Sequence, residues 1–224
     1  MKLKRLALFC SAVILTFFFL IAYLVYLNSS LILSKTLSNT TQTPVTVGAI
    51  GFLRDAFTIQ RLVISNPKDA YLPTAFKAET IKVSSAYTSY FRQTVVIEKI
   101  EVDDVFLNIE FYTEDKLTGN WQALFDNMGK SDQLMKNNRQ TLIKQLVLRN
   151  VQVNLILAGG KIHRLSPIDQ LEFEGLSSDE GFPVQQISEI IAKKMIYSVL
   201  KEEGLNLIIK IPLKVIKKLC PFLP

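Results

Sequence analysis

VIEKIEVDDVFLNI, at residues 96–109, lines up with LIKQLVLRNVQVNL at residues 142–155, 46 positions further along the chain. A third, partial copy is FTIQRLVISNP at residues 57–67, which matches the chain from Val95 onward at an offset of 38. All three share an apolar residue, two polar residues, then apolar, any residue, apolar, and a polar pair. Self-similarity of this kind predicts a repeated structural unit.

Each copy alternates apolar and polar residues, which is typical of a β-strand with one buried face. The alternation slips by one position at the polar pairs Ser65-Asn66, Asp103-Asp104 and Arg149-Asn150. A slip sends the apolar set to the opposite face of a sheet unless a bulge or a tight bend absorbs it. We therefore expect a bend or a bulge at the polar pair of each copy, and the pattern leaves both open.

The segments between and after the copies complete a mixed architecture. Residues 76–85 and 171–173 predict further strands, and residues 120–136 predict a helix with an apolar stripe. The expected fold class is α+β: an N-terminal transmembrane helix, a β-rich module of repeated antiparallel strands forming a curved sheet or groove, packing helices, and a C-terminal amphipathic helix. The module is expected to span residues 45–183.

The N-terminal region predicts a membrane anchor. Residues 6–27 form a run of 22 residues without a charge, which as a helix spans about 33 Å, the thickness of the hydrocarbon core of a bilayer. A cleaved signal peptide is the alternative, but its apolar core is shorter and ends at small residues, whereas this run ends in bulky ones. Residues 1–5 hold three cations and the first cation after the span is Lys35. The positive-inside rule then predicts a cytoplasmic stub at 1–5, a linker at 28–44 and a module outside the cytoplasm.

The distribution of charge along the chain disfavours a general nucleic-acid binder. The chain carries a formal charge of +6, of which residues 1–5 supply +3 and residues 184–224 supply +4, leaving −1 on the 178 residues between them. A nucleic-acid reading needs cations spread over the folded domain, so no nucleic-acid partner is expected. The segment at 184–224 is basic and amphipathic, and it is open whether it caps the sheet or contacts an anionic membrane surface. The expected membrane-surface residues are Lys210, Lys214, Lys217 and Lys218.

Motifs for catalysis are not found in the sequence. The single histidine, His163, has no second His and no Cys nearby, so a zinc site lacks ligands. The pair Asp103-Asp104 is replaced by other residue types in the other repeat copies, as suits a turn and not a catalytic pair. No nucleotide-binding glycine motif and no G-x-S-x-G occur. We expect no catalytic residues, no metal, no cofactor and no enzymatic activity.

The order of these features resembles the N-terminal module of the AsmA-like envelope proteins, the group that includes TamB. The resemblance lies in an N-terminal span, a strand that closes on Asn-Pro, two further strands, and a Gly-Asn-Trp-x-x-Leu ending, over roughly residues 1–160. The residues that carry it are Asn66, Pro67, Gly119, Asn120, Trp121 and Leu124. In that family an elongated sheet, curved into a hydrophobic groove, is thought to shield lipid acyl chains between two membranes. The resemblance implies that this chain is a short, single-module member of that family.

The resemblance implies a single-pass protein of the inner (cytoplasmic) membrane with its N-terminus in the cytoplasm and its module in the periplasm. The expected function is a non-catalytic role in lipid handling, lipid transport or outer-membrane biogenesis. The partners considered are membrane lipids and an envelope protein. Burial of an acyl chain in such a groove is favourable by about 0.8 kcal/mol per CH₂. The candidate lipid-contacting residues are Ile100, Val102, Val105, Leu107, Ile109, Phe111, Leu146, Leu148, Val151, Val153 and Leu155. The alternative is that they fill a closed core, and that the module is a scaffold in an envelope complex.

Overall fold

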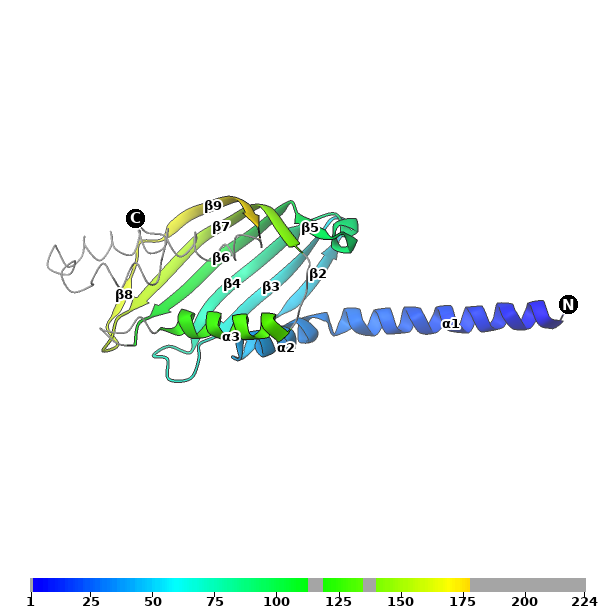
Figure 1. The fold of residues 1–224 in the computed structure, drawn as a ribbon, viewed down its shortest axis with the longest axis horizontal. Coiled ribbons are helices and arrows are strands. Elements are labelled where there is room, and N and C mark those ends of the chain that lie inside the picture. Colours follow the sequence, from blue (N-terminus) through cyan, green and yellow to red (C-terminus); the bar gives the residue numbers. More distant parts are fainter. Residues whose placement is uncertain (1, 113–118, 135–139, 178–224) are drawn as a thin grey trace.

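The structure is a computed structural model, and it describes residues 2–112, 119–134 and 140–177. The described part is a mixed α+β fold in which a large, curved, unclosed sheet carries helices at its lower edge, with a long helix extending from one end (Figure 1). The described elements are, in chain order, α1 (Lys2–Leu27), α2 (Ser29–Thr41), β1 (Val45–Thr46), β2 (Ala49–Leu53), β3 (Ala56–Ser65), β4 (Thr74–Ser84), the short 3₁₀ helix η1 (Tyr87–Phe91), β5 (Thr94–Ile97), β6 (Lys99–Glu110), α3 (Asn120–Leu134), β7 (Gln140–Ile156), β8 (Ile162–Arg164) and β9 (Ile168–Ser177).

All nine described strands belong to one sheet. Its main path runs β1-β3-β4-β6-β7-β5, with β2 paired to β3, and β8 and β9 paired to β7. The pairs β3–β4 and β4–β6 are antiparallel, as are the pairs that β7 forms with β8 and β9. The strands predicted at residues 57–67, 76–85 and 171–173 are thus present, as is the helix predicted from residue 120.

The two clearest repeat copies pair with each other, and the offset of the repeat is the register of the pairing. Val96 lies opposite Leu142, and Ile100 lies opposite Leu146, so the offset of 46 holds from β5 through β6 along the whole of β7. This pairing is parallel, so the expectation of antiparallel repeat strands is wrong for these copies. The reason is the connection: parallel neighbours need a crossover of a dozen or more residues, and the segment containing α3 provides it.

The predicted slips are absorbed by left-handed residues. Asp104 and Asn150 have positive backbone φ angles of 55° and 49°, and the ladder between β6 and β7 is interrupted there. Each strand therefore keeps its apolar residues on one face on both sides of the break, as with Val102 before Asp104 and Val105 after it.

In β3 the corresponding residue lies earlier than the sequence predicted. Arg61 has a φ of 50° and occupies the place of Asp104 and Asn150, so the structural offset from β3 to β6 is 43 and not 38. At the polar pair Ser65-Asn66 the register between β3 and β4 also shifts, between Ile64 and Ser65. The irregularity predicted at this polar pair is present, but it is separate from the left-handed residue at Arg61.

These interruptions form one line across the sheet, which we call the break line. On β4 and β9 the residues on this line are left out of the pairing between their neighbours. The break line consists of Arg61, Glu79, Asp104, Asn150 and Asp169. The pairing keeps its register across this line, since Gln60 pairs with Thr80 before it and Leu62 with Ala78 after it. The line therefore interrupts the ladder without inserting the extra residue of a β-bulge.

The break line gives a direct prediction for Asp104. The left-handed conformation costs a β-branched residue about 1–2 kcal/mol and costs glycine nothing. Asp104→Val is expected to lower the free energy of unfolding by about that amount relative to Asp104→Gly. Both variants lose the hydrogen bond that Asn150 Nδ2 donates to Asp104 Oδ1. The difference between their unfolding free energies therefore reports the cost of the left-handed backbone conformation. Thermal unfolding followed by circular dichroism measures it, and equal stabilities would contradict the assignment.

The predicted linker contains a helix, α2. Its hydroxyl side chains donate to carbonyls four residues earlier, as Ser34 does to Ser30 and Thr36 does to Ile32, and no glycine or proline interrupts it. The carbonyl of Thr41 accepts a hydrogen bond from Asn127 Nδ2 of α3 at 3.0 Å. The two helices therefore lie side by side along the lower edge of the sheet (Figure 1).

Among the described residues, no single helix is long and apolar enough to cross a membrane. Val13–Leu27 of α1 and the whole of α2 reach that length and composition only together, and the two are bent by 60° relative to each other. The C-terminal segment at 184–224, with its four lysines predicted to contact a membrane surface, lies outside the described residues.

Candidate functional site

One face of the sheet is apolar from β4 to β9, and we call it the apolar face. Its side chains come from both sides of the break line and form a single hydrophobic cluster, joined by Trp121 of α3. The cluster consists of Phe76, Ala78, Ile81, Ile100, Val102, Val105, Leu107, Ile109, Trp121, Ile143, Leu146, Leu148, Val151, Val153, Leu165, Ile168, Leu171, Phe173 and Leu176. Among the described helices, only α3 adds a side chain to this cluster, at one end of the face.

Nine of the eleven candidate lipid-contacting residues belong to the apolar face. The other two are Leu155, which is buried outside the cluster, and Phe111, which is half-buried and bridges to Gly119. Most members on β6 and β7 are buried, from Val151 at 0% exposed to Leu107 and Leu146 at 7%, and Ile100, Ile109 and Ile143 are half-buried. The sequence therefore predicted which side chains gather on this face, and in the structure their surfaces are withdrawn from solvent.

A buried polar network lies at the end of β6, beside the apolar face. Its centre is Glu110, whose side chain is 1% exposed. Glu110 Oε1 accepts hydrogen bonds from Asn66 Nδ2 and from the backbone N–H of Leu72, both at 2.9 Å, and Oε2 accepts one from the N–H of Tyr71 at 2.7 Å. The carboxyl group thus fixes the loop between β3 and β4 to the end of β6.

Asn120 joins this network to the start of α3. Its Oδ1 accepts hydrogen bonds from the backbone N–H groups of Glu110 and Trp121, both at 2.9 Å. Its Nδ2 donates to Asn66 Oδ1 at 2.7 Å and to the carbonyl of Asn108 at 2.8 Å. Trp121 Nε1 donates to the same carbonyl at 2.8 Å. All four polar atoms of the two asparagine amides are therefore used, which fixes the helix against the strand.

The residues that carry the family resemblance thus meet in space. Asn66 and Asn120 bond directly, Trp121 packs on the apolar face, and Leu124 is buried. Gly119 leaves no room for a side chain, since a Cβ would lie 2.2 Å from the carbonyl oxygen of Glu110. Pro67 follows Asn66 at the start of the loop and is half-buried. Sequence reasoning missed Glu110, although its position opposite the apolar alternation is visible, because such a position usually faces solvent.

The opposite face carries charged residues. Arg149 bonds Glu101 at 2.8 Å and Asp103 at 3.0 Å, and Lys99 lies 3.0 Å from Glu101. The Arg149 guanidinium, with the Lys99 ammonium, lowers the pKa of Glu101 to about 2. The two ion pairs of Arg149 cross from β7 to β6 and complement the parallel pairing of the two repeat strands.

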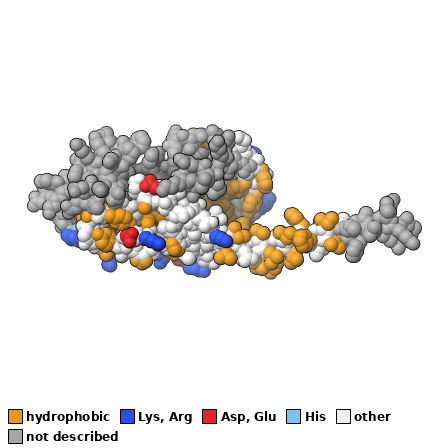
Figure 2. All heavy atoms as spheres, turned by 60° about the horizontal axis from the view of Figure 1, so that its bottom comes forward, with side chains coloured by type: hydrophobic (Ala, Val, Ile, Leu, Met, Phe, Trp, Pro, Cys, Tyr) orange, Lys and Arg blue, Asp and Glu red, His pale blue; other side chains and the backbone are white. Residues whose placement is uncertain are grey.

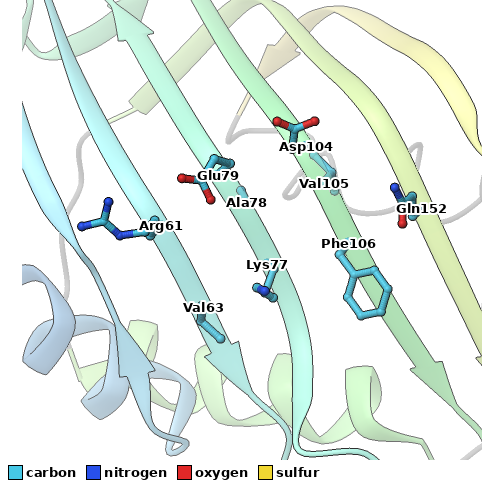
Figure 3. Close-up of a pocket in the computed structure, with 9 residues that line it drawn as sticks. All are labelled: Arg61, Val63, Lys77, Ala78, Glu79, Asp104, Val105, Phe106 and Gln152. Atoms are coloured by element: carbon cyan, nitrogen blue, oxygen red, sulfur yellow. The ribbon is translucent and has the colours of Figure 1, made fainter.

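A pocket of about 560 Å³ lies on this charged side, along the break line. Figure 3 shows Arg61, Glu79 and Asp104 around it on three strands, with Phe106 and Gln152 on its far side. Arg61 and Asp104 point away from each other, so the charged groups do not converge on one point (Figure 3). Across the described ranges, no group of three or more His, Cys, Asp or Glu side chains could hold a metal ion. His163 lies on β8, opposite Leu155, and is buried.

Comparisons with known proteins give no family for this chain. No family model matches it, and no curated protein matches it significantly.

Proposed function

We propose that the protein is a membrane-anchored component of the cell envelope that handles lipids without catalysis, and that acyl chains bind at the apolar face. The observation that carries this proposal is the unclosed sheet whose apolar side chains run without interruption from β4 to β9. Such a face favours acyl chains by about 0.8 kcal/mol for each CH₂ buried. The charged groups of Glu101, Asp103 and Arg149 pair with one another on the opposite side of the sheet, so these three do not compete with acyl chains at this face.

Residues 6–27 are proposed as the anchor that places this module at the inner membrane. The uncharged run lies wholly within α1, and from Val13 to Leu27 its large apolar side chains are exposed, as expected of a surface that lipid covers. The three cations before it support an N-terminus in the cytoplasm and a sheet outside it, in the periplasm. The resemblance to the AsmA-like module supports the same arrangement.

Burial at the apolar face sets a condition on lipid binding. Val105 and Val151 are 1% and 0% exposed, so an acyl chain that touches them replaces contacts made within the chain. The energy of lipid burial is then a difference between two apolar environments, and we expect lipid to bind with a rearrangement and to exchange slowly.

The same burial favours a second candidate function. If the contacts on the apolar face are permanent, the cluster is an ordinary core, and the module is a scaffold that docks a partner in the envelope. The scaffold has no lipid requirement, so the two candidates differ in what the purified protein carries.

Native mass spectrometry of the full chain, extracted in mild detergent, tests the proposal. We expect bound phospholipid on the wild type and its loss from Ile109→Asp, which places a charge on the apolar face. The matched control is Phe106→Asp, since Phe106 is also half-buried but belongs to the charged side. Circular dichroism checks that both variants fold. A wild type without lipid, or a folded Ile109→Asp variant that retains it, supports the scaffold instead.

A further inference from the structure

Most of the exposed large apolar side chains that the structure describes outside α1 and α2 lie at one end of the sheet, and Tyr71 and Ile162 are the exceptions. Phe52 and Leu53, at the turn between β2 and β3, are 52% and 53% exposed, and Phe91, at the end of η1, is 84% exposed. The turn and η1 lie at the end of the sheet from which α1 extends (Figure 1). Figure 2 shows hydrophobic side chains continuing from α1 onto this end of the sheet. We call Phe52, Leu53 and Phe91 the apolar rim.

Direct contacts join the apolar rim to the end of α1. The rings of Tyr26 and Phe52 lie 5.8 Å apart between their centres. Tyr87 of η1 donates from its hydroxyl to the carbonyl of Leu53, and the same hydroxyl lies 3.3 Å from the carbonyl of Ala56. The turn, η1 and the last residues of α1 are therefore held together as one surface.

We propose that the apolar rim inserts into the interfacial layer of the membrane that α1 spans, so that this end of the sheet rests on the bilayer. The proposal rests on the anchor in the proposed function. Tyr26 lies in the last turn of α1, the level at which amphipathic rings meet lipid headgroups, and its contact places Phe52 at that depth. Arg54 and Arg92 follow the rim residues directly and suit lipid phosphates, with Asp55 as the acidic neighbour.

A lipid surface explains the rim better than a protein partner does. The exposed residues are continuous with an apolar helix and include aromatic rings, which favour a membrane interface. Insertion of the rim also determines which end of the apolar face lies nearest the bilayer. Ala56, Ser84 and Lys99 pair across adjacent strands at this end, so Ile100 and Ile81 of the apolar face lie next to it. Lipid leaving the bilayer at the rim meets the apolar face first at these residues.

Fluorescence of the full chain in anionic phospholipid vesicles tests the insertion. Cys10 and Cys220 are replaced by alanine, and a single cysteine at Leu53 or Phe91 carries an environment-sensitive dye. The matched control is Ile162→Cys, because Ile162 is also exposed, at 48%, but lies on β8 at the other end of the sheet. We expect a nitroxide attached at the lipid headgroup to quench the dye at positions 53 and 91 about twofold more than at position 162.

Flotation of the vesicles in alkaline carbonate tests the membrane anchor separately from insertion of the apolar rim. If the chain floats but the dye at positions 53 and 91 is quenched no more than at 162, the rim does not insert and the anchor stands. If the chain does not float, the anchor is wrong and the rim proposal falls with it. Bound lipid is measured independently by native mass spectrometry. If no lipid is found, quenching at positions 53 and 91 still supports insertion of the apolar rim.

Discussion

Glu110→Ala is expected to lower the free energy of unfolding by about 3–5 kcal/mol. The substitution removes the acceptor of three donors: the backbone N–H groups of Tyr71 and Leu72 and the amide of Asn66. Glu110 is 1% exposed and its bond from Asn66 is buried, whereas its bonds from Tyr71 and Leu72 are partly buried. A buried donor left without a partner costs its full desolvation free energy, and here one buried and two partly buried donors lose their acceptor at once.

Thermal unfolding of the full chain in mild detergent, checked by proteolysis, measures this loss. Glu110→Gln keeps the shape and one acceptor oxygen, so we expect an intermediate loss. The control is Glu79→Ala, because Glu79 is an exposed acid on β4 and its removal should change stability by less than about 0.5 kcal/mol. A Glu110→Ala variant as stable as this control would show that the network does not hold the loop.

Gly119→Ala is the second substitution with a large expected effect. A Cβ at this position lies 2.2 Å from the carbonyl oxygen of Glu110, which belongs to the backbone and has no side-chain freedom to move away. The added methyl group must displace β6 or the start of α3, at a cost of about 3 kcal/mol.

Gly175→Ala provides the comparison for Gly119. Gly175 has a φ of 65°, and a Cβ there meets nothing within 4 Å, so alanine costs only the left-handed strain of about 1 kcal/mol. The two unfolding temperatures, measured side by side, give the difference. A smaller loss at Gly119 than at Gly175 would contradict the close approach of α3 to β6.

The sequence repeat predicts the register between two strands of the sheet but not their direction. The offset of 46 between the copies is the register of β6 on β7, because copies with the same apolar spacing pair best when they lie side by side. Strand direction was not predictable from the pattern, since alternation reads the same in both directions. It depended on the connection, where α3 makes a parallel crossover possible.

The sequence pointed to some residues of the polar network but not to the contacts between them. Asn66 lies in a polar pair where a bend or a bulge was expected, and Trp121 lies in the predicted helix with an apolar stripe, which describes part of what each does. That Asn66 and Asn120 touch across 54 positions could not be predicted. Glu110 looked like a solvent-facing residue because alternation places it opposite the apolar set, and nothing local indicates that the loop before β4 covers it.

The state of the apolar face is likewise a question of three-dimensional arrangement. Alternation identifies Val102, Leu107 and Val153 as inward residues, but an open groove and a closed core need the same side chains. What distinguishes them is the occupant of the face, which a strand pattern does not encode. Lipid binding at this face is the central claim, and it can be read at single positions.

Site-specific photo-crosslinking in the native membrane tests that claim most directly. A photoreactive phenylalanine analogue replaces Phe76 or Phe106, which are both half-buried and lie on neighbouring positions of β4 and β6. Phe76 belongs to the apolar face and Phe106 lines the pocket on the charged side. We expect phospholipid adducts from position 76 and none from position 106. Crosslinks from position 76 that join only parts of the same chain would contradict the proposal and identify the apolar face as a closed core.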